Sequence, residues 1–147
     1  MAIVVGAAAV ATIAGVLAYA TDPPASSSQR IGDWLADSKA PGDTGFVAYG
    51  LPSLLEAADL SSPYPYLWSL PMRTLDPAQD RLRATLAGTR APTWIVGVTG
   101  LNSWNIDAGG RLRALLRQRY RVVAQVCGRP VWLRRDVTRD LAALPDC

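Results

Sequence analysis

Few residues in this 147-residue chain have types and spacings that could support catalysis. Histidine is absent, which excludes Ser-His-Asp and Cys-His catalysis and every histidine-ligated metal site within the chain. Among the acidic residues, Asp107 stands out because it lies just beyond the apolar run 93–99, where open α/β sheets place their ligands. An N-cap on the following helix would explain Asp107 without any catalytic role, and both interpretations stay open.

The aromatic segment 61–72, with the sequence SSPYPYLWSLPM, has the composition of a binding surface. Its three prolines disfavour a helix and a central strand, so Tyr64, Tyr66 and Trp68 are predicted to lie on an extended segment. Such rings concentrate at membrane interfaces because one end is apolar and the other forms hydrogen bonds. They would rest the domain on lipid headgroups or line a groove for a lipid-linked ligand. Alternatively, the segment simply covers a sheet edge or the core.

The two cysteines, Cys127 and Cys147, are compatible with a disulfide on the oxidising side of a membrane. Two free thiols, one of them buried, explain the sequence equally well. Neither cysteine belongs to a C-x-x-C motif or to a metal-ligand spacing, and no nucleotide-binding glycine motif is present. The sequence therefore predicts no metal and no cofactor.

The apolar run 2–20, AIVVGAAAVATIAGVLAYA, contains no charge and is just long enough to cross a bilayer as a helix. We interpret residues 1–22 as a transmembrane helix and residues 23–147 as a water-soluble α/β domain. Three origins of the helix remain open: the last membrane helix of a longer protein, an N-terminal anchor, or a cleaved signal peptide. The signal peptide is disfavoured because Met1 is followed directly by apolar residues instead of a basic region.

Helix and strand signals alternate after residue 23, which predicts an α/β domain with a mainly parallel sheet that ends in an antiparallel hairpin. The predicted helices follow Ser26, Leu51, Asp76 and Gly110, and Asp76 with Gln79 forms a capping-box pattern. The predicted strands cover 46–49, 93–99, 120–126 and 131–133. Asn102, Trp104 and Asp107 fall in the polar loop 100–110.

The formal net charge of +3 comes from 15 basic and 12 acidic residues. All basic residues except Lys39 are arginines, and they fall on separate elements. No basic stripe interleaved with aromatic residues is present, so nucleic acid is not an expected partner.

The order of these motifs resembles the C-terminal end of bacterial GT-C type membrane glycosyltransferases, the family-39 and ArnT-like enzymes. The resemblance is carried by a membrane helix followed by QRIGDWLADSKAPGDTGFVAYG, SPYPYLW, APTWIVGV and LRALLRQRYRVVAQVCGRPVWLRR. In those enzymes a bundle of membrane helices is followed by a small α/β domain on the extracytoplasmic side. The resemblance covers nearly the whole chain, and its specificity comes from the order of motifs that are individually weak.

The resemblance implies a non-catalytic part of an enzyme that transfers a sugar from a polyprenyl-phosphate donor, because the family's catalytic acids belong to membrane loops absent from this chain. The domain would cap the active cavity from the extracytoplasmic side of the plasma membrane. Its partners would be the bilayer, the remaining membrane helices and a polyprenyl-phosphate-linked sugar, faced by the aromatic segment and the loop 102–107. The alternative is a single-pass envelope protein whose α/β domain binds a partner or a cell-wall component.

Overall fold

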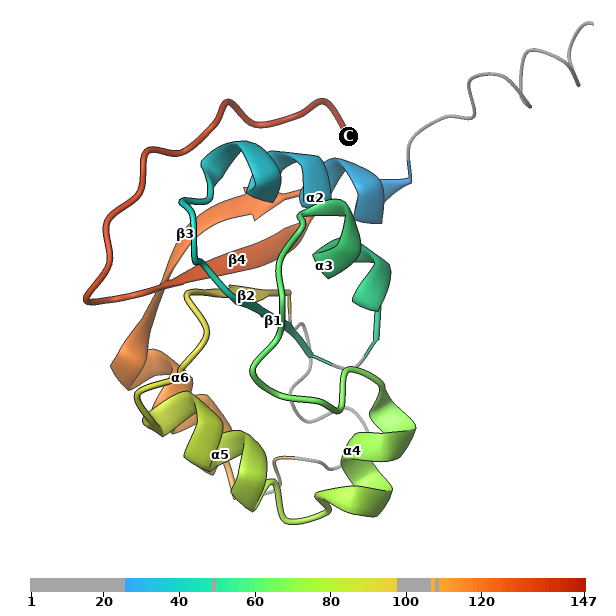
Figure 1. Ribbon diagram of the computed structural model, residues 1–147, viewed down its shortest axis with the longest axis vertical. Helices are drawn as coiled ribbons and strands as arrows, with labels where there is room; N and C mark the ends of the chain where they lie inside the picture. Colours follow the sequence, from blue (N-terminus) through green and yellow to red (C-terminus); the bar gives the residue numbers. More distant parts are fainter. Residues whose placement is uncertain (1–25, 49, 98–106, 108) are drawn as a thin grey trace, which may run out of the picture.

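A four-stranded sheet lies between two groups of helices in the computed structural model, which describes residues 26–48, 50–97, 107 and 109–147 (Figure 1). The elements in chain order are α2 (Ser27–Ser38), β1 (Gly45–Val47), α3 (Pro52–Ala57), α4 (Ser69–Leu75), α5 (Asp80–Ala87), β2 (Trp94–Val96), α6 (Arg111–Arg119), β3 (Tyr120–Val126) and β4 (Arg129–Arg134). The α/β class predicted from the alternating signals is confirmed.

The sheet is mixed, with the strand order β1-β2-β4-β3. Only β1 and β2 pair in parallel, and β4 is antiparallel to both of its neighbours. The prediction of a mainly parallel sheet is therefore wrong, although the final hairpin is confirmed. The tight turn at Cys127 and Gly128, both with positive φ, folds β4 back between β2 and β3. The crossover through α6 thus joins two strands that do not pair with each other.

The hydrophobic core occupies both faces of the sheet because neighbouring strand residues point in opposite directions. Val47 and Val96 pack on the side of α2 and α3. Phe46 and Ile95 pack on the other side, with residues of α4, α5 and α6. The apolar run near residue 95 is accordingly a strand covered on both faces, as its composition predicts.

Helix α2 begins and packs as its sequence predicts. The Ser26 side chain accepts a hydrogen bond from the backbone N–H of Gln29, which caps the first turn. Ile31 and Leu35 lie in the core. Gly32 faces Ala57 of α3 so closely that any larger side chain would clash there.

Two predicted boundaries are wrong in the segment before α5. Residues 69–72 are helical rather than extended, since Pro71 lies in the first turn of α4, where backbone N–H groups have no partner within the helix. Helix α5 begins at Asp80 rather than directly after Asp76. Gln79 adopts a left-handed conformation, so the predicted capping box does not form.

The described residues contain no helix that is long and apolar enough to span a membrane. The helix predicted over 2–20 lies outside the described residues, as do Asn102 and Trp104.

Candidate functional site

Tyr64 is a core residue and not a surface residue. Its ring is fully buried and contacts the ring of Phe46 edge-on. Its hydroxyl donates a hydrogen bond of 3.0 Å to Oδ2 of Asp76. Burial and this carboxylate neighbour raise the pKa of the Tyr64 phenol above its ordinary value. The expectation that Tyr64 faces a membrane is therefore corrected.

Asp76 connects this buried tyrosine to the start of α5. Its carboxylate accepts hydrogen bonds from the backbone N–H groups of Arg81 at 3.1 Å and Leu82 at 2.9 Å. The residue thus caps the helix, as its type predicts, but from four positions before the first helical residue.

Asp107 performs the same structural role for α6. Its two carboxylate oxygens accept hydrogen bonds from the N–H groups of Leu112 at 3.0 Å and Arg113 at 2.9 Å. Like Asp76, it accepts from the fifth and sixth residues that follow it. Of the two interpretations left open by the sequence, helix capping accounts for the contacts of Asp107.

The aromatic segment becomes progressively more exposed toward α4. Tyr66 is half-buried, and the guanidinium of Arg81 lies 5.4 Å from its ring centroid. Trp68 is 61% exposed. Only Trp68 of the three predicted aromatic residues therefore offers most of its side chain to a partner.

Two further apolar side chains, both on α4, are exposed. Leu70 is 67% exposed and Leu75 is 63% exposed. Together with Trp68 they account for three of the six large apolar side chains exposed in the described part of the chain. We call Trp68, Leu70 and Leu75 the α4 surface. Isolated exposed leucines are ordinary, but two on one short helix with an exposed tryptophan at its N-cap make α4 a candidate contact surface.

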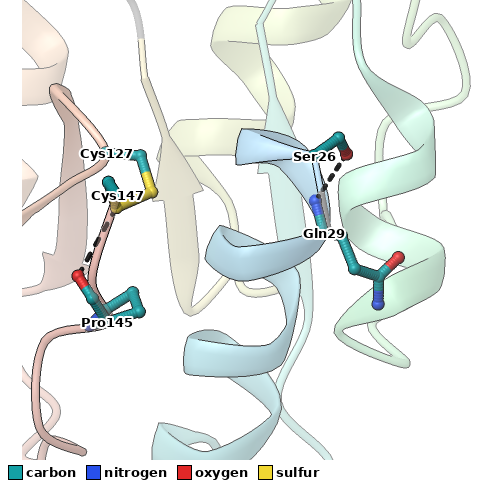
Figure 2. The surroundings of a disulfide bond; sticks show 5 residues. All are labelled: Ser26, Gln29, Cys127, Pro145 and Cys147. Carbon is teal, nitrogen blue, oxygen red and sulfur yellow. Dashed lines mark hydrogen bonds between the residues drawn. A yellow bond between two sulfur atoms is a disulfide. The ribbon is translucent and has the colours of Figure 1, made fainter. Parts of the chain in front are cut away.

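The two cysteines form a disulfide that fixes the C-terminal segment. Cys127 lies in the turn between β3 and β4, and its Cα is 5.3 Å from that of Cys147. Figure 1 shows the tail running back past α2 to the C-terminus, and Figure 2 shows the disulfide together with Pro145. Trp34 donates its indole N–H to the carbonyl of Ala142, so the segment packs back on α2.

A polar cleft of about 450 Å³ lies at the end of the sheet where β1 and β2 begin. Thr44 and Thr93, which precede these strands, line it, as does Arg134 at the end of β4. Its other charged lining residues are Asp43, Arg90 and Arg139. Three arginines and one aspartate give the cleft a net positive charge.

Asp43 is the central acceptor of this cleft. Burial alone would raise its pKa, but hydrogen bonds from Arg139, from the N–H of Ala40 and from the indole of Trp94 hold the pKa at about 2. The carboxylate is therefore ionised at neutral pH.

The chain matches no family model, no curated protein and no solved structure in comparisons with known proteins. Within the described ranges, no three His, Cys, Asp or Glu side chains are grouped to hold a metal ion.

Several residues of interest were missed by reasoning from the sequence. The sequence does not mark Leu70 and Leu75 as exposed, because the nearby prolines predict an extended segment instead of a helix. Asp43 and Arg139 are 96 positions apart, and nothing local in the sequence indicates that they pair. An arginine in the tail opposite an acidic turn residue is too common a combination to predict a cleft.

Proposed function

We propose that this chain is the non-catalytic, extracytoplasmic end of a membrane glycosyltransferase that uses a polyprenyl-phosphate sugar donor. In this proposal residues 1–22 span the plasma membrane, and the α/β domain caps the active cavity of the enzyme. The domain contacts the bilayer surface through α4.

The observation that carries the proposal is the exposed apolar character of the α4 surface. In Figure 1, α4 and the first turn of α2 both lie at the right-hand side of the described residues. The apolar sequence run 2–20 joins the domain at this first turn. In this proposal the membrane plane lies on that side, so that it meets α4 and the point where the predicted membrane helix joins the domain.

The energetics of that contact are favourable. Burying a fully exposed Leu or Trp side chain contributes about 1.5–3 kcal/mol, and the three side chains are each exposed by more than half. Trp68 suits the interface because its ring is apolar and its indole N–H can contact headgroups. The α4 surface would therefore supply several kcal/mol in addition to the insertion of a membrane helix.

The disulfide supports the extracytoplasmic side of the membrane. Disulfides persist in oxidising compartments and are rare in the cytosol. The bond between Cys127 and Cys147 holds the tail against the domain. A reducing cytosol would open this bond, so the proposal places the domain outside the cytosol.

The domain contributes no catalytic group in this proposal. Histidine is absent from the chain, and the buried acids Asp76 and Asp107 are used as helix caps. Transfer chemistry would require acids from other membrane loops.

The test is to read the DNA frame upstream of the Met1 codon and to assay the purified chain with a polyprenyl-phosphate sugar. We expect an open frame through several apolar segments of membrane length, with an acidic residue in an early loop, and no turnover by the chain alone. An in-frame stop directly upstream, behind a ribosome-binding site, would contradict the proposal and favour the single-pass envelope protein. Turnover by the purified chain would also contradict it.

A further inference from the structure

The polar cleft is built around a carboxylate whose charge is already neutralised. Oδ1 of Asp43 accepts from Nη2 of Arg139 at 2.6 Å, and Oδ2 accepts from Nε at 2.9 Å. The Asp43 side chain is only 4% exposed. The carboxylate therefore does not repel an anion in the cleft, because its charge is paired with a cation that the tail supplies.

The remaining arginines leave donors available. Arg134 uses Nη1 to donate to the carbonyl of Ala91 at 2.6 Å and Nε to donate to Asp136 at 2.6 Å. Arg90 is exposed and has no hydrogen bond or ion pair with any residue that the structure describes. A complete guanidinium fork thus lines the cleft without a partner from that part of the chain.

Hydroxyl side chains also line the cleft. Ser61 and Thr89 line the same cleft as Arg90. A guanidinium fork with neighbouring hydroxyl donors matches the several oxygens of a phosphate group. The volume of about 450 Å³ is typical of a small-molecule site and exceeds what a phosphate alone would fill.

We propose that this cleft binds the phosphate group of a ligand larger than phosphate itself, with Arg90 as the direct partner of the phosphate and the pair of Asp43 and Arg139 as the fixed wall. The ligand is a free phosphate monoester or a repeating unit of a phosphodiester polymer. The site is separate from the α4 surface and does not depend on the glycosyltransferase proposal.

The experiment titrates the full chain in mild detergent with inorganic phosphate at constant ionic strength and follows binding by calorimetry. Sodium chloride at the same ionic strength is the salt control. A second arm uses a glycerol phosphate oligomer, which distinguishes a polymer from a free monoester. The variants are Arg90→Gln and the matched control Arg113→Gln, whose side chain is exposed on α6 away from the cleft.

We expect saturable binding of one of the two probes, with an affinity at least tenfold weaker in Arg90→Gln and unchanged in Arg113→Gln. Because Arg90 is exposed and unpaired within the described residues, its variant should fold normally, which an unchanged melting temperature would verify. No saturable binding of either probe would overturn the proposal. Equal affinity in wild type and Arg90→Gln, or an equal effect of chloride, would overturn it as well.

Discussion

Asp43 and Arg139 form a bidentate ion pair that joins the turn before β1 to the C-terminal tail, 96 residues later in the chain. The Asp43 side chain is nearly inaccessible to solvent. Its carboxylate oxygens accept hydrogen bonds from the Arg139 guanidinium, the Trp94 indole and the N–H of Ala40. The pair fixes the tail over one end of the sheet.

The low pKa of Asp43 predicts how stability changes with pH. In the unfolded chain the carboxyl titrates near 3.8, and in the folded protein near 2. A carboxyl whose pKa is lower in the folded than in the unfolded state stabilises the fold at pH values above its unfolded-state pKa. Here the contribution is about 2 kcal/mol, and it is lost as the pH falls from about 4 toward 2.

Asp43→Asn removes this contribution and leaves Arg139 without its counter-charge. We expect the free energy of unfolding at pH 7 to fall by about 2–4 kcal/mol. The measurement is chemical unfolding of the full chain in mild detergent from pH 7 to pH 2. The difference between wild type and variant should narrow below pH 4, and a difference that stays constant down to pH 2 would contradict the assignment.

Removal of the disulfide should release the tail. The bond closes a loop with a sequence separation of 20, for which chain entropy gives a stabilisation of about 3 kcal/mol. Cys127→Ser with Cys147→Ser should lower the free energy of unfolding by about that amount and speed tryptic cleavage after Arg139. Cleavage at the wild-type rate in the double variant would show that the ion pair alone holds the tail.

The hydroxyl of Tyr64 should contribute to the free energy of unfolding, and that of Tyr66 should not. Tyr64→Phe removes a buried donor from Asp76, and we expect a loss of about 1–2 kcal/mol in the free energy of unfolding. Tyr66→Phe is the matched control, because its hydroxyl only accepts a long bond of 3.3 Å from exposed Arg81. Similar effects of the two substitutions would contradict the assigned role of the Tyr64–Asp76 bond.

Local sequence patterns predicted the features that local physics determines. Ser26 caps α2, Leu82 and Leu86 form the apolar side of α5, and Gly88 ends that helix. The hairpin follows from Gly128, whose positive φ suits a tight turn. These features depend on residues within a few positions of each other.

Features that depend on distant contacts were not predictable from such patterns. The insertion of β4 between β2 and β3 is decided by strand pairing rather than by the composition of β3. Tyr64 lies in a proline-rich segment that indicates a surface, yet its hydroxyl finds a buried partner twelve residues later. The sequence places Asp107 near the start of a helix but does not say whether it caps that helix or binds a ligand. Only its hydrogen bonds in the folded protein identify it as a cap.

The contact of α4 with the bilayer can be measured directly by fluorescence. The full chain would be reconstituted in vesicles with brominated acyl chains and in ordinary vesicles. The chain has five tryptophans, so the Trp68 signal is obtained by subtracting the emission of Trp68→Phe from that of wild type. Buried Trp94 and the other tryptophans cancel in this subtraction.

If α4 rests on the membrane, brominated lipid should quench the Trp68 signal by at least about half, because an interfacial side chain reaches the boundary of the acyl chains. Equal Trp68 emission in brominated and ordinary vesicles would contradict the membrane contact on which the proposed function rests.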